Sequence, residues 1–127
     1  MRFLAPVLLL SLLFAIAYPA IAAEHRGTCW ITEIATFENR VHIRCLTSSP
    51  GSFSSHPGSN LPDPGVVYLA VDTTKSLDFA NRVLAIAETA VQIKAYVSVI
   101  YESDTAQNPP GCLTADCRKL TAVTLSN

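Results

Sequence analysis

The fold of this chain is decided by VVYLAVDTTKSLDFANRVLAIAETAVQIKAYV, residues 66–97, because the hydrophobic period of this stretch changes twice. Residues 65–72 form a nearly continuous apolar run, which is typical of a buried strand. The period then becomes 3.6 residues, which predicts an amphipathic helix with Thr74 or Ser76 as its N-cap. Residues 91–101 alternate between apolar and polar, which predicts a second strand.

The faces of these elements follow from the same periods. We expect Asp78, Arg82 and Glu88 on the polar side of the helix. The apolar side is expected to consist of two rows: Leu77, Ala80, Leu84 and Ala87, and beside them Phe79, Val83, Ile86 and Ala90. In the strand that follows, the residues expected to face inward are Val91, Ile93, Ala95, Val97 and Val99, and those expected to face outward are Gln92, Lys94, Tyr96 and Ser98.

Upstream, TCWITEIATFENRVHIRCLT predicts a β-hairpin, with β-branched residues on both arms and a turn around Phe37. Cys29 and Cys45 are equally distant from this position, so a hairpin centred there sets them opposite each other and makes Ile31 face Ile43. This geometry favours a disulfide between the two cysteines. It would close a loop of about 17 residues and stabilise the fold by about 3 kcal/mol.

The other two cysteines lie in GCLTADCRKL, residues 111–120, and three kinds of site use such a pair. A zinc site would need a second pair of ligands, which the three histidines do not supply at a matching spacing. A redox pair usually has two residues between its cysteines, and here there are four. We therefore expect a disulfide between Cys112 and Cys117, giving two disulfides in total, as is common in oxidising compartments.

The first residues, 1–22, have the layout of a secretory signal peptide: Arg2, an apolar run and then small residues. The alternative is a membrane anchor, but the unbroken apolar run of about 15 residues is shorter than the roughly 20 that cross a bilayer. We expect cleavage after Ala22 or Ala23, which leaves a single secreted or periplasmic domain, 23–127. Without Arg2 the chain has eight basic and ten acidic residues, a net charge of −2, which argues against nucleic acid or anionic lipid as the main partner.

The remaining segments complete the expected order. Residues 47–64 are rich in Ser, Pro and Gly and predict a long loop, and residues 119–126 predict a closing strand. The chain is therefore expected to be mainly β, with three strands, one helix and two strands. This is the order of the OB-fold, a five-stranded, partly open Greek-key barrel. The alternative with the same order is an open antiparallel sheet with one helix on its face.

The strand, helix and strand of 66–97, together with the late cysteine pair and the final strand, resemble small exported bacterial OB-fold proteins. More distantly, the chain is similar to the B subunits of AB5 toxins of the subtilase-cytotoxin and typhoid-toxin type. The resemblance covers the topology of the mature chain and implies a lectin-like subunit that assembles as a ring pentamer and binds sialylated glycans. It transfers no site residues, because no glycan-contacting motif of those subunits matches a position here.

The sequence contains no motif that predicts catalysis, a metal or a cofactor. There is no G-x-S-x-G elbow and no glycine-rich phosphate loop. We interpret His56 as a solvated loop residue, His42 as an exposed strand histidine, and Glu33 as a residue at the barrel rim unless the strand register slips there. A non-enzymatic binding module for a glycan, peptide or protein is therefore favoured, with a structural protein of the cell envelope as the alternative.

A candidate binding surface lies on the outward side of the predicted strands. It is centred on Trp30, with Tyr96, Lys94 and Arg44 nearby, and Arg44 lies opposite Trp30 in the predicted register. Aromatic rings beside cations on a sheet are suited to stacking and hydrogen bonding with a sugar. The alternative is that Trp30 fills a second small core beneath the loop 47–64.

Overall fold

The computed structural model describes residues 23–47 and 58–125. Its elements, in chain order, are β1 (Glu24–Cys29), β2 (Ile31–Thr36), β3 (Arg40–Cys45), β4 (Tyr68–Asp72), α1 (Leu77–Ile93), β5 (Val97–Glu102), the short 3₁₀ helix η1 (Thr105–Gln107) and β6 (Cys117–Leu125). The expectation of a mainly β chain with one α-helix is confirmed. The expected signal peptide, 1–22, the central part of the expected loop, 48–57, and His56 within it lie outside the described residues.

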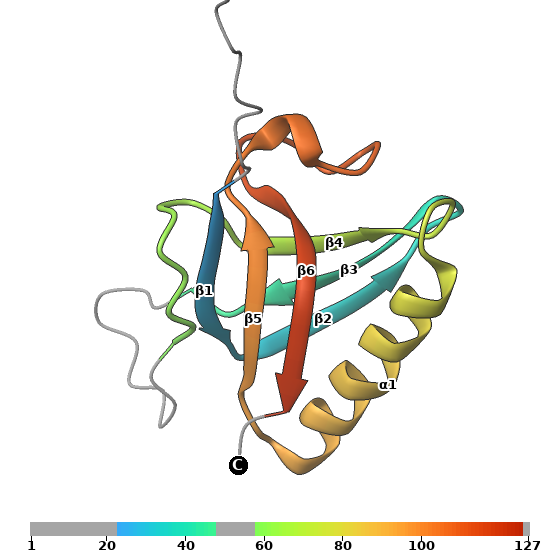
Figure 1. Cartoon of the computed structure of the whole chain (residues 1–127). Coiled ribbons are helices and arrows are strands. Elements are labelled where there is room, and N and C mark those ends of the chain that lie inside the picture. The colour runs from blue at the N-terminus through green and yellow to red at the C-terminus, as the bar shows by residue number, and fades with distance from the viewer. Residues whose placement is uncertain (1–22, 48–57, 126–127) are drawn as a thin grey trace, which may run out of the picture.

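The six strands form one mixed sheet in the order β1-β5-β6-β4-β3-β2. β4 and β6 are parallel, and every other neighbouring pair is antiparallel. Figure 1 shows two layers, in which β1, β5 and β6 cross in front of β4, β3 and β2. The sheet is open by its hydrogen-bonded order, although β1 and β2, at its two ends, are separated in the chain by Trp30 alone. The described residues thus form six strands where we expected five, because the first expected strand, which began at Thr28, is interrupted at Trp30 and its first part belongs to a separate strand that starts upstream at Glu24.

The register of the β2–β3 hairpin differs from the prediction. Ile34, rather than Ile31, is aligned with Ile43, because the turn is centred between residues 38 and 39 and not on Phe37. The Phe37 amide donates to the carbonyl of Arg40 at 2.7 Å, which closes this tight turn. A bulge between residues 31 and 33 then shifts the pairing again toward the end of the hairpin.

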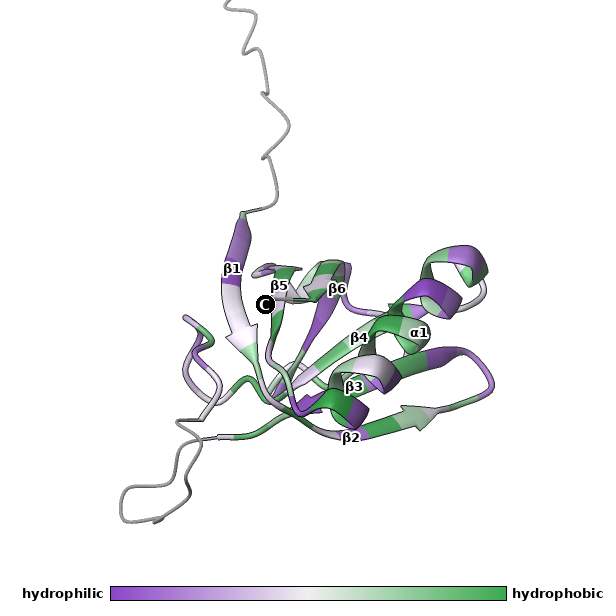
Figure 2. Cartoon of the chain, turned by 90° about the horizontal axis from the view of Figure 1, so that it is seen from below, coloured by the Kyte–Doolittle hydropathy of each residue, from purple (hydrophilic) through white to green (hydrophobic). Residues whose placement is uncertain are grey.

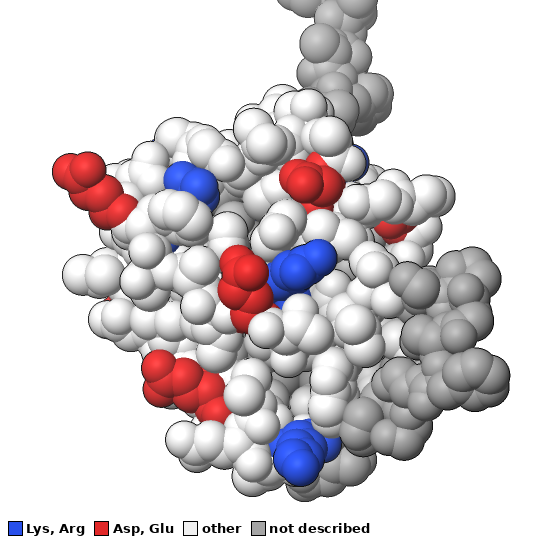
Figure 3. Space-filling view, turned by 180° about the vertical axis from the view of Figure 1, so that it is seen from behind, with Lys and Arg blue, Asp and Glu red and all other residues white. Residues whose placement is uncertain are grey.

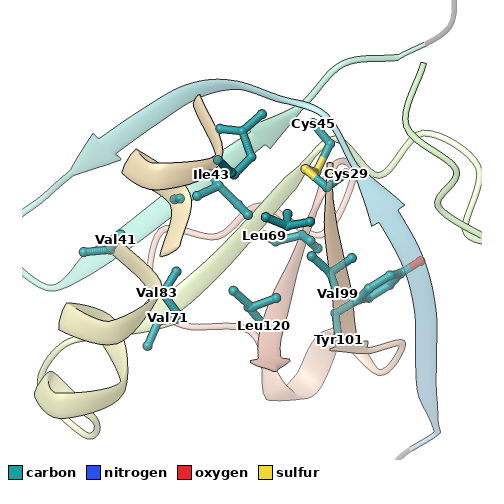
Figure 4. Close-up of a cluster of buried hydrophobic side chains, with 14 of the residues drawn as sticks. Cys29, Val41, Ile43, Cys45, Leu69, Val71, Val83, Val99, Tyr101 and Leu120 are labelled. Carbon is teal, nitrogen blue, oxygen red and sulfur yellow. A yellow bond between two sulfur atoms is a disulfide. The ribbon is translucent and has the colours of Figure 1, made fainter. Parts of the chain in front are cut away.

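Both expected disulfides are present. Cys29 and Cys45 are joined with their Cα atoms 5.1 Å apart, and Cys112 and Cys117 with theirs 5.3 Å apart. The first pairing was correct although the register behind it was wrong, because Cys29 is on β1, across from Val97 of β5, and not on the hairpin. This disulfide therefore ties the two layers of the sheet together, and in Figure 4 it lies over the aliphatic core.

The helix α1 is longer than expected and replaces the start of the expected strand. It continues to Ile93 and ends at Lys94, whose φ of 54° is in the left-handed region. Val91 and Ile93 are therefore 48% and 55% exposed, so their predicted inward orientation was wrong. Leu77 is also exposed, at 60%, because the first buried position of the helix comes one turn later, at Ala80.

Other details of α1 follow the sequence pattern. Asp78, Arg82 and Glu88 are exposed as predicted. Ser76 holds the N-cap position but makes no capping hydrogen bond through its side chain. The buried side of α1 consists of small residues, Ala80, Val83, Ala87 and Ala90, and small side chains let a helix approach a sheet closely. Figure 2 shows α1 lying across β2, β3 and β4, with hydrophobic and hydrophilic residues alternating along it.

The core lies between the two layers and α1. Its fully buried members with the largest side chains are Tyr101, Ile43, Leu69, Leu120, Val83, Val97 and Val99, together with Cys29 and Cys45. Val97 and Val99 face inward as predicted, since β5 alternates strictly between buried and half-buried positions. The strand expected at 65–72 begins only at Tyr68, and its residues Leu69 to Val71 are all buried. Figure 4 shows side chains from both layers meeting in this cluster.

Candidate functional site

Trp30 and Tyr96, two residues of the predicted binding surface, lie together. Their ring centroids are 4.9 Å apart and the ring planes meet at 60°, an edge-to-face arrangement. Trp30 is half-buried between β1 and β2, and Tyr96 directly precedes β5. The backbone N–H of Trp30 donates to Ser59 Oγ at 2.7 Å. Trp30 is thus neither an open aromatic plate nor a fully buried core residue.

The two cations expected beside this pair have other positions in the fold. Lys94 caps the C-terminus of α1 and is exposed, so it is not an outward residue of a strand. Arg44 is on the outer side of β3, where its guanidinium carbon lies 5.9 Å from the ring centroid of Tyr68. Its partner across the hairpin is Glu33 and not the tryptophan, because the register differs from the prediction. The structure therefore gives Arg44 a different aromatic neighbour.

A second group of aromatic side chains, which the sequence analysis missed, covers the outer face of β3 and β4. Phe37, His42 and Tyr68 form this ring cluster. The centroids of Phe37 and His42 are 4.9 Å apart, and those of His42 and Tyr68 are also 4.9 Å apart. His42 points outward because its neighbours Val41 and Ile43 are buried in the core. The alternation of 41–45 was the signal for this face, but it could not reveal Tyr68, which is brought alongside by the β3–β4 pairing.

A guanidinium group lies at each end of the ring cluster. Arg40 is placed over Phe37, with 3.8 Å between its guanidinium carbon and the ring centroid, and Arg44 is near Tyr68 as described above. The Arg40 side chain also lies against Gly111, where any Cβ would clash with the guanidinium and where φ is 84°. The positive φ favours glycine at this position, whereas the contact with the flexible Arg40 side chain could be relieved by a movement of that side chain. Cation–π contacts of this kind hold a cation and a ring in a fixed relative position.

His42 also has an acidic partner within the ring cluster. Its Nε2 is 3.1 Å from Glu33 Oε1, so the imidazole is fixed between two rings and a carboxylate. The interpretation of His42 as an exposed strand histidine was wrong, since its side chain is only 13% exposed. We expected Glu33 either at the barrel rim or at a place where the strand register shifts. The structure shows the shift, because the bulge after Ile31 places Glu33 beside Arg44 on the outer face.

The segment Gly111–Cys117, held by its disulfide, forms a wall beside the ring cluster. The disulfide packs on Ala70 and Tyr68 from the outer side of the sheet. The carbonyl of Asp116 accepts from the backbone N–H of Val67 at 2.9 Å and from that of Tyr68 at 3.0 Å, which fixes this segment to β4. A hollow of about 150 Å³ lies here, lined by Arg40, His42, Tyr68, Gly111, Leu113, Asp116 and Cys117.

The hollow offers three kinds of interaction to a ligand. Tyr68 and His42 supply ring surface, Arg40 is a hydrogen-bond donor and Asp116 carries an acceptor. Leu113, at the edge, is 67% exposed. Figure 3, which shows the molecule from behind, has a mostly uncharged surface with a few acidic and basic side chains, two of which, of opposite charge, lie side by side near the centre. The arrangement is suited to an uncharged or weakly charged ligand with both an apolar face and polar edges.

His25, Asp63 and Tyr101 form a separate polar cluster at the edge of the core. His25 Nδ1 is 2.8 Å from Asp63 Oδ2, and the Asp63 backbone N–H donates to the Tyr101 hydroxyl at 3.2 Å. Burial raises the pKa of Tyr101 to about 12. These contacts link a histidine, a carboxylate and a buried phenol. They anchor the segment around Asp63 to β1 and β5.

Among residues 23–47 and 58–125, no three His, Cys, Asp or Glu side chains are grouped so that they could hold a metal ion. No α-helix in the described part of the chain is both long and apolar enough to cross a membrane. Comparisons with protein-family models, with curated proteins and with solved structures find no match. The site must therefore be interpreted from its own chemistry.

Proposed function

We propose that this protein is an exported, non-enzymatic binding module that holds a glycan on the outer face of β3 and β4. The observation that carries the proposal is the ring cluster of Phe37, His42 and Tyr68, which adjoins a hollow with a donor, Arg40, and an acceptor, Asp116. A sugar ring has an apolar face that stacks on an aromatic ring, and hydroxyl groups at its edge that both donate and accept. The hollow provides partners for each of these groups.

The rigidity of the face supports a binding role. His42 and Tyr68 are on paired strands, the Arg40 guanidinium lies over the Phe37 ring, and the wall of the hollow is closed by the Cys112–Cys117 disulfide. Binding groups that are fixed before the ligand arrives lose little conformational entropy when it binds. A preorganised polar and aromatic surface is more than solubility requires, since isolated charged residues would serve that purpose.

The strand arrangement supports an OB-fold-like barrel. The order β2-β3-β4-β6-β5-β1, the parallel β4–β6 pair and the single residue between β1 and β2 fit a Greek-key sheet whose first strand bends and pairs with both layers. In OB-folds the face of the second and third strands binds oligosaccharides and oligonucleotides. Here β3 and β4 correspond to those strands if β1 and β2 are taken as one bent strand.

Export is supported by the two disulfides, which form in oxidising compartments. Intact-mass measurement of the exported protein tests this directly, because the mass reports both the cleavage position and the number of disulfides. Native mass spectrometry of the same sample gives the oligomeric state. A pentamer supports the toxin-subunit resemblance, and a monomer removes it.

A protein partner is the second candidate, and the exposed apolar residues favour it. Leu113, which lines the hollow, is 67% exposed, and Phe37, in the adjoining ring cluster, is 43% exposed. Aromatic and arginine side chains are common at the centres of protein interfaces. A structural role in the cell envelope would use the same face for a permanent contact. The two protein-binding alternatives do not require the hollow to accept a free sugar.

The proposal is tested by NMR titration of the ¹⁵N-labelled protein with methyl glycosides of neutral and acidic sugars and with short oligosaccharides. We expect saturable shifts at residues 40–44, 67–69 and 111–117, and at least tenfold weaker binding for Tyr68→Ala. Tyr96→Ala, at the other aromatic pair, is the control and should leave binding unchanged. Chemical-shift changes centred on Trp30 and Tyr96 would place the binding site there instead. If no sugar gives saturable chemical-shift changes, the proposal of a glycan ligand is rejected.

A further inference from the structure

A cavity of about 170 Å³ lies at the end of the molecule where α1 begins, away from the ring cluster. Four segments surround it: the end of β4, the start of α1, η1 with the residues that follow it, and the start of β6. Its lining residues are Val71, Asp72, Lys75, Ser76, Phe79, Ala106, Gln107, Asn108, Pro109, Pro110, Lys119 and Leu120. None of these residues lines the hollow beside the ring cluster.

Two lysines from different elements line this cavity. Lys75 precedes α1, and Lys119 is half-buried on β6. Both ion pairs found among the described residues involve histidines, so neither lysine ammonium is in one. Lys75 is exposed and Lys119 is half-buried, and an anion placed within reach of both ammonium groups gains favourable Coulomb energy from each.

Asp72 is the single acidic residue that lines the cavity, and it is already engaged. Its Oδ1 accepts from the backbone N–H of Thr74 at 2.9 Å and from Thr74 Oγ1 at 2.5 Å. The hydrogen bond from the Thr74 side chain lowers the pKa of Asp72, and the charge of Lys75 lowers it further. Two lysines and one aspartate leave a net charge of +1 on the cavity lining.

The start of α1 adds donors to the same space. Ser76 holds the N-cap position without a capping hydrogen bond from its side chain, so its hydroxyl does not occupy the first amides of the helix. On the opposite wall, Asn108 Nδ2 donates to the carbonyls of Cys117 at 3.0 Å and Cys112 at 3.4 Å. The wall that faces α1 is thereby fixed to the second disulfide.

We propose that this cavity binds a small ligand with an oxyanion group, a phosphate or a carboxylate, between Lys75 and Lys119. The anionic group lies between the two ammonium groups and the first turn of α1. The ring of Phe79 and the prolines at 109 and 110 supply apolar contact for a compact body attached to it. The volume is well below the roughly 300 Å³ at which drug-sized sites begin, so the ligand is a small molecule or the terminal group of a larger one.

The test is an NMR titration of the ¹⁵N-labelled full-length mature protein with inorganic phosphate and, separately, with sodium acetate, at constant ionic strength. We expect saturable shifts of the amides of 75–79 and 106–110. Lys75→Gln and Lys119→Gln should each weaken the apparent affinity at least fivefold, and Lys119→Arg should restore most of it. Arg82→Gln removes one positive charge from the exposed side of α1 and is the matched control, with no expected effect.

The two probes separate the sources of the oxyanion. Saturable binding of phosphate alone assigns the site to phosphorylated ligands, binding of acetate alone assigns it to carboxylates, and binding of both probes assigns it to both classes. The inference is overturned if neither probe gives localised, saturable shifts. It is also overturned if the two lysine variants bind as the control does. The result is independent of the glycan proposal, since the two sites share no lining residue.

Discussion

The two disulfides should contribute unequally to stability, and the difference can be worked out from their loops. The Cys29–Cys45 disulfide spans 16 positions and the Cys112–Cys117 disulfide spans 5. In the chain-entropy model these loops, of about 17 and about 6 residues, correspond to about 3 and about 2 kcal/mol. All four cysteines are buried, so replacing either pair by alanine adds a similar packing loss, and the difference of about 1 kcal/mol remains.

The assay is urea unfolding under non-reducing conditions, followed by far-UV circular dichroism, for the two double-alanine variants and the wild type. We expect the Cys29→Ala/Cys45→Ala variant to be the less stable of the two, with a larger slope because its unfolded state is less compact. The Cys112→Ala/Cys117→Ala variant should keep its stability better but lose binding at the ring cluster, whose wall it loosens. Equal losses of stability, or the reverse order, would refute the reasoning.

Three further predictions concern single side chains. Leu69→Ala should cost about 2 to 5 kcal/mol because Leu69 is 1% exposed, whereas Leu77→Ala should stay within about 0.5 kcal/mol; chemical denaturation compares this matched pair. In the folded protein the pKa of Tyr101 is about 12, above the ordinary value of 10, so the free energy of unfolding should fall as the pH rises from 10 to 12. In an absorbance titration at 295 nm, Tyr101→Phe should remove the tyrosine ionisation that occurs at the highest pH. Trp30 is the single tryptophan, so Tyr96→Ala should shift its emission to the red and increase its quenching by acrylamide; an unchanged spectrum would contradict the ring contact.

The sequence predicted the features of this fold that depend on composition and period. The strong alternation of 97–101, the amphipathic centre of α1 and the spacing of the cysteines gave a mainly β chain with one helix and both disulfides. The alternation and the helical period are local signals, and four cysteines can pair in only a few ways. None of these predictions requires the register between neighbouring strands to be known.

The hairpin register and the end of the helix were not predictable from the same signals. Moving the turn from Phe37 to residues 38 and 39 shifts the pairs between the turn and the bulge by three positions, and the resulting face is still apolar because Ile34 replaces Ile31 opposite Ile43. The helix ends at a left-handed lysine, Lys94, where glycine or asparagine would have been the recognisable stop. Three residues, 91–93, fit both a helix and an alternating strand.

The candidate site was found only in part, for a related reason. Trp30 and Tyr96 were predicted to share a surface, and they are in contact. The ring cluster combines a turn residue, Phe37, with His42 and Tyr68 from neighbouring strands. Its members are up to 31 positions apart in the sequence, and Tyr68 lies in a run that reads as wholly buried. Only the β3–β4 register reveals that this tyrosine points outward.

The placement of β1 has a consequence for how the chain acquires its fold during synthesis. Glu24–Cys29 pairs along its whole length with Val97–Glu102, so β1 lacks its main strand partner until one of the last strands has been made, although Thr28 also bridges to Asn60. Until then its hydrogen-bonding groups are satisfied by water, and contacts so far apart in sequence form slowly. Truncation before residue 97 would therefore leave β1 without its main strand partner, Val97–Glu102, rather than yield a smaller folded unit.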